Sequence, residues 1–421
     1  MRILIATAGS RGDVAPFTGL GARLSAAGHQ VALAAHTAFA DSVRAAGLEF
    51  RPLPVDPRTE LASARGQQLL RTGTGPLGLV RLARMAGSFL PALGSGIAAA
   101  AEPGADLLLT TSTTAHLGEV VAEAAGIPSI TLTLQPLLPT RAFAPPVIGA
   151  RSLGGPGNLL AGRAVQAAAD RFAAPAVRAL RRRLGLPPRP MTRDLGNHPI
   201  LNGYSRHVVP RPADWRPSHE VAGYWWPHPD PGWQPPQRLL DFLAAGPPPV
   251  YLGFGSLVVP DPERLSATLL AAVRTARVRA VVQSGWSGLA APDGADDVLT
   301  IGDAPHDWLF PRTSVTVHHA GAGTTAATLR AGTPTVPVPA QLDAPFWSDR
   351  LTRLGTSPGP VPLARLTPAR LAAAIRRALD DPRHRTRARL LADALAKEDG
   401  AAAVLTRIDR IAERPGGPGQ R

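Results

Sequence analysis

Residues 315–325 read Val315-Thr-Val-His-His-Ala-Gly-Ala-Gly-Thr-Thr325. An apolar run typical of a buried strand is followed by a glycine turn and then by the start of a helix. Unpaired N–H groups and the positive end of the helix dipole make such a helix start an anion site. A histidine beside the turn, such as His319, can donate to a phosphate. We therefore favour phosphate binding over an ordinary strand–helix turn.

The same segment also fits a dinucleotide-binding fingerprint. Gly321-x-Gly323-x-x-Ala326 has the glycine spacing, and Asp343 lies 20 residues beyond Gly323, where a ribose-binding acid is expected. A nicotinamide-dependent oxidoreductase is thus a second hypothesis. Two features weigh against it: the fingerprint follows a complete α/β domain, and the segment 341–347 is more elaborate than one acidic residue requires.

Working outward from residues 315–325, strands and helices alternate in both halves of the chain. This alternation predicts an α/β fold with parallel sheets covered by helices on both faces. In the first half we expect strands at 2–7, 30–35, 106–111 and 129–134, and helices at 16–27, 39–46, 77–101, 114–125 and 159–184. In the second half we expect strands at 250–254, 279–283, 298–301, 315–319 and 335–339, with helices between and after them.

The composition changes between residues 210 and 249, where eleven prolines and several tryptophans fall. Such proline density opposes regular secondary structure, so we expect a linker packed onto the domains. The predicted organisation is a first domain at 1–209, the linker at 210–249 and a second domain at 250–396. A C-terminal helix at 397–412 and a disordered tail at 413–421 complete the chain.

Length and composition bound the function. The chain has 421 residues, of which 44% are hydrophobic and 18% charged, so a mostly disordered protein is excluded. The absence of cysteine excludes disulfide scaffolds, thiolate metal sites and cysteine nucleophiles. No His, Asp or Glu cluster has metal-ligand spacing, so we expect no metal site. The N-terminus does not resemble a signal peptide and no apolar run would span a bilayer, so we expect a cytoplasmic protein.

The net charge is +14, from 45 basic and 31 acidic residues, and nearly every basic residue is arginine. Such an excess favours an anionic partner, although a GC-rich genome produces the same bias. The cluster of Arg178 and residues 181–183 ends a helix; it is either a solvated face or a weak contact with anionic lipid. No recognised nucleic-acid-binding module accompanies the charge, so we expect no nucleic-acid partner.

Three further sites carry polar groups at expected strand ends. Ala8-Gly-Ser-Arg-Gly-Asp13 follows the first strand, and Asp13 is either a general base towards a hydroxyl or a simple helix cap. Tyr251-Leu-Gly-Phe-Gly-Ser256 holds the matching place in the second domain and can offer a hydroxyl to phosphate. Trp286 follows the next strand and can stack on a base or simply pack. His116 opens a helix and can face the cleft.

Together these motifs resemble those of the family 1 glycosyltransferases of actinobacteria, which include sterol glucosyltransferase-like and antibiotic glycosyltransferases. The resemblance runs over almost the whole chain. It rests on 9–14, 210–226, Gly253-Phe-Gly-Ser256, Asp303-Ala-Pro-His-Asp-Trp308, 318–324 and Asp343-Ala-Pro-Phe-Trp347. It implies the GT-B fold, in which two Rossmann-like domains with parallel sheets face each other across a cleft. The C-terminal helix is then expected to cross back to the first domain.

The resemblance also implies roles for individual residues. Asp13 would deprotonate the acceptor hydroxyl. The diphosphate of a UDP- or dTDP-sugar would be held by residues of both domains: Ser10, Gly12, Ser256, His319, Gly321, Ala322, Gly323 and Thr324. Trp286, Asp303 and Ala304 would frame the base, and Asp343 and Ala344 would meet the sugar. The expected reaction is an inverting, metal-independent transfer to a hydroxyl of a lipophilic acceptor such as a polyketide, macrolide or sterol. The protein itself is expected to be a monomer or homodimer.

Two residues depart from the family pattern. Asp343 is followed by Ala344 where Asp-Gln is usual, which removes an amide that reads the sugar. A deoxy or unusual sugar, low activity, or a non-catalytic nucleotide-sugar-binding protein would each fit this change. Ala320 stands where glycine is usual, and we expect its methyl group to leave phosphate binding intact.

Overall fold

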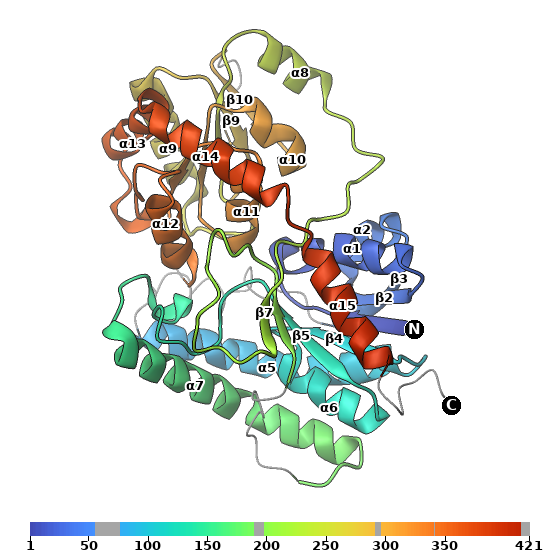
Figure 1. The fold of residues 1–421 in the computed structure, drawn as a ribbon. Coiled ribbons are helices and arrows are strands. Elements are labelled where there is room, and N and C mark those ends of the chain that lie inside the picture. Colours follow the sequence, from blue (N-terminus) through green and yellow to red (C-terminus); the bar gives the residue numbers. More distant parts are fainter. Residues whose placement is uncertain (55–75, 189–197, 291–295, 341, 414–421) are drawn as a thin grey trace.

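The computed structural model describes residues 1–54, 76–188, 198–290, 296–340 and 342–413; side chains of the helix beginning at Pro76 are described from residue 87 onward. The chain forms two α/β domains, each built on one parallel sheet (Figure 1). None of the described helices is long and apolar enough to cross a bilayer. The expected tail lies almost wholly outside the described residues.

The first domain holds a seven-stranded sheet in the order β3-β2-β1-β4-β5-β6-β7, with every neighbouring pair parallel. Its strands are β1 (Arg2–Ala6), β2 (Gln30–His36), β3 (Glu49–Leu53), β4 (Leu107–Thr111), β5 (Ser129–Thr133), β6 (Ile200–Asn202) and β7 (His219–Val221). Its helices are α1 (Arg11–Ala26), η1 (Thr37–Phe39), α2 (Ala40–Ala45), α5 (Pro76–Ala101), α6 (Ala115–Ala125), η2 (Pro146–Ile148) and α7 (Gly154–Arg183).

Alternating side chains of the strands bury both faces of this sheet. On β1, Ile3 and Ile5 point to one core and Leu4 and Ala6 to the other, as the two-residue period of a strand requires. Helix α1 fills the first core with Phe17, while α5, α6 and α7 fill the second. This two-sided burial explains the nearly continuous apolar runs that predicted the strands.

The second domain repeats the plan with the order β10-β9-β8-β11-β12. Its strands are β8 (Val250–Gly253), β9 (Ala280–Gln283), β10 (Val298–Ile301), β11 (Val315–His318) and β12 (Thr335–Pro337). Its helices are α8 (Gln237–Ala244), α9 (Pro262–Ala276), α10 (His306–Leu309), η3 (Phe310–Arg312), α11 (Ala322–Arg330), α12 (Ala344–Arg353), η4 (Leu363–Arg365), α13 (Pro368–Asp380) and α14 (Pro382–Leu395). Helices α9 and α13 cover one face, and α8, α10 and η3 pack on the other.

The proline-rich segment 210–249 carries more regular structure than expected. It contains β7, which extends the first sheet beyond β6, and α8, which begins directly after Pro236. Proline restricts helix interiors but is tolerated at or just before a helix start, and β7 lies at the sheet edge, where few ladder bonds are needed. The prediction that this segment has no regular structure was therefore wrong at these two places.

The C-terminal helix α15 (Gly400–Ala412) leaves the second domain and packs on the first (Figure 1). Ala401, Val404 and Ile408 join the core beneath α1. Asp399 caps the helix and its carboxylate accepts from Arg23 of α1 at 2.7 Å. The two domains are thus connected by both the proline-rich segment and this helix.

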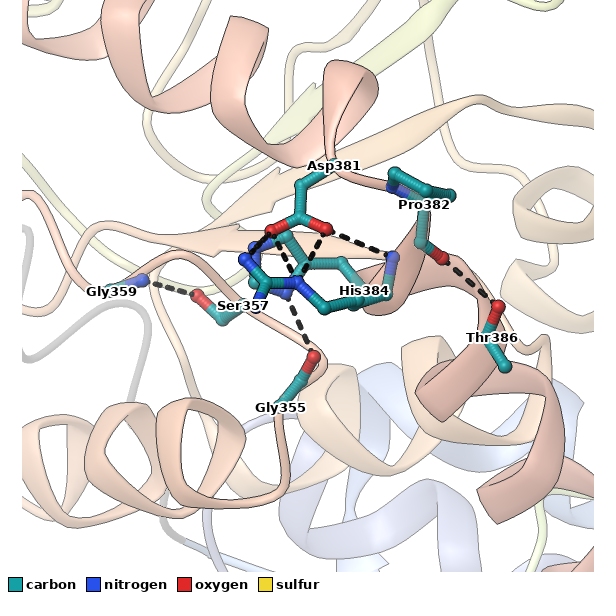
Figure 2. Close-up of polar contacts among 8 residues, drawn as sticks. Gly355, Ser357, Gly359, Asp381, Pro382, His384 and Thr386 are labelled. Atoms are coloured by element: carbon teal, nitrogen blue, oxygen red, sulfur yellow. Dashed lines mark hydrogen bonds and ion pairs between the residues drawn. The ribbon is translucent and has the colours of Figure 1, made fainter.

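A group of polar contacts joins the turn between α13 and α14 to the end of α12 in the second domain (Figure 2). The Asp381 carboxylate accepts from the backbone and the guanidinium of Arg383, which holds its pKa at about 2. The His384 Nδ1 lies 2.8 Å from the carbonyl oxygen of Gly355, at the end of α12. The turn after α12 is thereby joined to the start of α14. These contacts involve none of the predicted site residues.

Candidate active site

The loop after β1 presents Asp13 at the carboxyl edge of the first sheet. Helix α1 begins at Arg11 rather than at the predicted Pro16, because Ser10 is its N-cap residue and Asp13 lies in the first turn. Asp13 Oδ2 accepts from the Ser10 backbone N–H at 2.8 Å and from the Ser10 hydroxyl at 3.0 Å. A Cβ at Gly9 would lie 2.4 Å from the same oxygen, so only glycine fits there.

Through these contacts one carboxylate oxygen of Asp13 caps helix α1, while the other can still accept a proton. Among the described residues, no protein donor engages its other carboxylate oxygen. Burial raises the pKa of Asp13 above its usual range, and the hydrogen bonds from Ser10 offset part of that rise. A half-buried carboxylate with a raised pKa and one free oxygen is suited to accept a proton near neutral pH. Gly12, beside it, is exposed.

The turn between β11 and α11 brings His319 against the helix start. Gly321 is the N-cap of α11, followed by Ala322, Gly323 and Thr324 in the first turn. A Cβ at Gly321 would lie 2.4 Å from His319 Nε2, and one at Gly255 would lie 3.0 Å from His319 Cε1. The imidazole therefore occupies space that side chains would otherwise fill. Its Nδ1 is buried and has no hydrogen-bond partner among the described residues.

Three neighbouring histidines are neutral at physiological pH. Burial lowers the pKa of His319 to about 4 and that of His306 to about 3, and it lowers the pKa of His318 strongly as well. His318 Nδ1 accepts from the backbone N–H of Ala320 at 3.0 Å, and His306 stacks on Phe310. His318 also has an unpartnered nitrogen, Nε2, among the described residues, but its side chain is fully buried. His319 is partly exposed and lies beside the helix start, so it is the better candidate for the predicted phosphate contact.

The loops after β8 and β9 lie on the same side of the second sheet. The backbone N–H of Trp286 donates to the Gly255 carbonyl oxygen at 2.9 Å, which brings Trp286 next to Ser256. Ser256 follows the glycine that contacts His319. The structure thus gathers Ser256, Trp286 and His319 at one sheet edge, where open α/β sheets bind ligands.

An ion pair joins this edge to the first domain. Arg11 Nη1 lies 3.0 Å from Asp303 Oδ2, with both side chains more than half exposed. Asp303 Oδ1 accepts from Gln283 Nε2 at 3.3 Å, and the Gln283 amide oxygen accepts from the Tyr251 hydroxyl. Ala304, next to Asp303, is buried. The expected base-binding residues therefore lie opposite the loop that carries Asp13.

Asp343 completes the arrangement from the second domain. Its Oδ2 accepts from the Trp347 indole N–H at 2.8 Å, four residues along the start of α12. Burial raises the pKa of Asp343, and the negative charge of Asp13 raises it further. The two carboxylates are thus within electrostatic reach of each other although they belong to different domains. The Ala344 methyl group packs into an apolar cluster with Phe346 and Trp347.

Ala320 and Leu342, the residue before Asp343, adopt left-handed backbone conformations that favour glycine. Ala320 has φ 63° and Leu342 has φ 57°. The departure at Ala320 is therefore more than an added methyl group, because an L side chain in this region costs about 1–2 kcal/mol. Strain of this kind is found at functional sites that the surrounding structure holds in place.

The sequence motifs did not indicate two residues of the site. Arg11 stands in a motif dominated by glycine and Asp13, and Trp347 stands in a motif whose assigned sugar contacts are Asp343 and Ala344. An i, i+4 spacing from Asp343 to Trp347 on a helix start was the available signal. His116 lies on α6, where its Nε2 is 2.8 Å from Asp170 of α7. That pairing gives His116 a partner on the helical side of the first domain.

Comparison with known proteins agrees with this geometry. Residues 3–144 match the glycosyltransferase family 28 N-terminal domain, and residues 286–410 match the erythromycin biosynthesis protein CIII-like C-terminal domain. The O-mycaminosyltylonolide 6-deoxyallosyltransferase of Streptomyces fradiae is 38% identical over 429 residues, covering 98% of each chain. The chain belongs to the family 1 glycosyltransferases.

Other relatives fit the same family. A sterol 3-beta-glucosyltransferase of Arabidopsis thaliana is 36% identical over 442 residues, covering 97% of this chain and 68% of the relative. Solved glycosyltransferases share the fold: that of kitacinnamycin has a TM-score of 0.71 at 21% identity, covering 97% of this chain and 98% of the other. VinC in complex with dTDP has a TM-score of 0.67 at 19% identity, covering 99% and 100%. The predicted GT-B fold is confirmed, and the oxidoreductase and non-catalytic alternatives are not favoured.

Proposed function

We propose that this glycosyltransferase transfers a sugar, with inversion, from a UDP- or dTDP-sugar to a hydroxyl of a lipophilic small molecule. The observation that carries the proposal is that Asp13 and Asp343, which belong to different domains, lie within electrostatic reach of each other. Asp13 has a free oxygen and a raised pKa, and its charge contributes to the raised pKa of Asp343 at the start of α12. The Arg11–Asp303 ion pair brings the loops of the two domains together. A base and a sugar ligand on opposing domains are what an in-line displacement requires.

The proposed step follows from these positions. The acceptor hydroxyl gives its proton to the free oxygen of Asp13 while its oxygen attacks the anomeric carbon. The bond from that carbon to the diphosphate oxygen breaks on the opposite side, and its electron pair leaves with the nucleoside diphosphate. Attack opposite the leaving group inverts the anomeric configuration.

The leaving diphosphate would be held by His319, the N–H groups of residues 321–324 and the Ser256 hydroxyl, with Ser10 and Gly12 on the opposite loop. A neutral imidazole can donate through one nitrogen, and backbone N–H groups at a helix start stabilise negative charge without titrating. We infer that these donors take up the charge without a metal ion. Unchanged transfer in the presence of a chelator supports this, and loss of transfer that Mg²⁺ restores would contradict it.

The relatives indicate the chemical classes of the acceptor and the donor, but they do not identify either molecule. Relatives named for a macrolide and for sterols act on bulky hydroxylated molecules, which supports a lipophilic acceptor here. The buried methyl group of Ala344 supplies no polar group to the sugar, which supports a deoxy sugar. A thermal-shift screen of UDP, dTDP and their sugars tests the donor. Stabilisation by a dTDP-deoxysugar above dTDP alone supports the proposal, and no stabilisation by any nucleotide would overturn it.

A further inference from the structure

Helix α7 forms the outer margin of the first domain, below α5 and α6, and no other described element lies beyond it (Figure 1). Its exposed residues are of five types only: glycine, proline, alanine, leucine and arginine. They are Gly154, Pro156, Leu160, Arg163, Ala164, Ala167, Ala168, Ala169, Arg171, Pro175, Arg178, Ala179, Arg182 and Arg183. We call these residues the outer face of α7; it carries no acid and no neutral hydrogen-bonding side chain.

The acidic partners of this region are engaged where α6 meets α7. Asp170 pairs with His116 of α6 at 2.8 Å, and the buried Arg181 pairs with Glu123 of α6 at 2.6 Å. By contrast, Arg163, Arg171, Arg178 and Arg182 form no ion pair with any described residue. The sequence agrees with this separation of acids from the outer face, because residues 124–169 contain no Asp or Glu. Within the described residues the charge of the outer face therefore has no acidic partner, unlike that of an ordinary surface helix.

Apolar side chains accompany this charge. Leu160 is 70% exposed on the helix, and Leu153, just before it, is 54% exposed. Leu160, Arg171, Arg178 and Arg182 fall on one side of the helix at 3.6 residues per turn. An apolar groove of about 320 Å³ lies between α5 and α7, lined by Gly87, Pro91, Phe172, Pro175, Ala176 and Ala179. Pro175 and Ala179 belong to both groove and outer face, so the two are continuous.

The apolar surface extends towards the second domain. Leu137 and Ile148 are nearly half exposed, and Ile148 belongs to η2, which contacts α12. Helix α12 begins directly after Asp343. The exposed leucines and isoleucine therefore reach from α7 to the side of the domain junction.

We propose that the outer face of α7 docks on an anionic lipid bilayer. Arginines that lack acidic partners attract anionic headgroups, and the neighbouring leucines and the groove offer apolar surface to acyl chains. A protein or nucleic-acid partner would meet the same charge but would not need the exposed leucines. Docking in this orientation places the acceptor domain against the membrane, where a lipophilic acceptor is dissolved.

Vesicle co-sedimentation of the full chain tests the proposal without any acceptor. The vesicles are phosphatidylcholine alone or phosphatidylcholine with about 30% phosphatidylglycerol. The α7 variant is Arg171→Gln/Arg178→Gln/Arg182→Gln. The matched control, Arg264→Gln/Arg274→Gln/Arg377→Gln, removes the same charge from exposed positions of the second domain. All substituted residues are exposed, so melting temperatures and donor hydrolysis in solution are expected to stay unchanged.

We expect the wild type to bind the anionic vesicles and the α7 variant to bind them about a hundredfold more weakly, at about fivefold per charge. The control should bind like the wild type. Leu160→Gln should weaken binding about tenfold, because a leucine is withdrawn from the acyl region. Equal loss in both triple variants, or no binding by the wild type, would overturn the proposal. The proposal would also be overturned if the protein bound double-stranded DNA as tightly as the vesicles and Leu160→Gln left vesicle binding unchanged. That result would show a surface that binds any polyanion.

Discussion

The Trp347 indole N–H donates to Asp343 Oδ2 across 2.8 Å, and Trp347 is itself almost wholly buried. The ring packs edge-on against Tyr204 of the first domain and against Phe346. The carboxylate that we assign to the sugar is thus held by a residue whose position depends on both domains.

Trp347→Phe should therefore impair recognition of the sugar more than that of the nucleotide. Loss of one hydrogen bond to a carboxylate, about 1.5–3 kcal/mol, predicts a ten- to hundredfold rise in KM for the nucleotide sugar. The Kd for the nucleoside diphosphate alone should not change. Phe346→Leu is the matched control, because it perturbs the same cluster and leaves the hydrogen bond intact. An equal KM rise in both variants would show that Trp347 acts only through packing.

His319→Gln should weaken binding of UDP or dTDP by ten- to a hundredfold, the effect of about 1.5–3 kcal/mol for a hydrogen bond to a charged group. Because burial lowers the pKa of His319 to about 4, the free ring is neutral from pH 6 to 8. Calorimetry should accordingly show the same loss throughout that range. His384→Gln removes the contact with Gly355 and is expected to lower the melting temperature without affecting nucleotide affinity. Comparable affinity losses in both variants would contradict the assignment of His319.

Ala320→Gly should leave stability unchanged or raise it by up to about 1 kcal/mol. Relief of the left-handed backbone at φ 63° gains about 1–2 kcal/mol, and the lost burial of one methyl group costs about 0.8 kcal/mol. Ala326→Gly, inside α11, is the control and should destabilise by about 1 kcal/mol or more. Urea unfolding measures both. Destabilisation of similar size in the two variants would show that Ala320 is not strained.

Asp13→Asn should stabilise the folded protein at neutral pH. The pKa of Asp13 is raised on folding, so the folded state binds more protons than the unfolded state between the two pKa values. Stability of the wild type is then greatest below the unfolded pKa and falls as pH rises through the raised folded pKa. The stability difference between variant and wild type should vanish in acid and grow towards neutrality. Melting temperatures across pH 4–8 report it; a constant difference would contradict the raised pKa.

The parallel sheets were predictable because their strands are apolar runs buried on both faces, as Ile3 to Ala6 and Leu107 to Leu109 show. Local patterns did not reveal that α1 begins at Arg11, because residues 9–13 read as a turn until Ser10 is seen to cap the helix. Strand β7 was missed because its three residues pair only with β6, a contact set by tertiary structure.

Each site residue was predictable from the motif of its own loop, without reference to the other loops. The carboxyl ends of parallel strands lie at one edge of their sheet, so the motifs after β1, β8 and β11 were expected at that edge of each domain. The family resemblance implied that these edges face each other across a cleft. Contacts between domains leave no periodic trace in sequence. The pairing of Arg11 with Asp303 and the influence of Asp13 on Asp343 required the arrangement of both sheets.

The central claim is that Asp13 accepts the proton of the acceptor hydroxyl. The most direct test is kcat for transfer by Asp13→Asn, measured with a dTDP- or UDP-sugar and a hydroxylated macrolide or sterol, with nucleotide Kd and melting temperature as controls. We predict that kcat falls by about a hundredfold or more while Kd stays unchanged and the melting temperature does not fall. A variant that binds nucleotide normally and retains kcat within about threefold of the wild type would contradict the account.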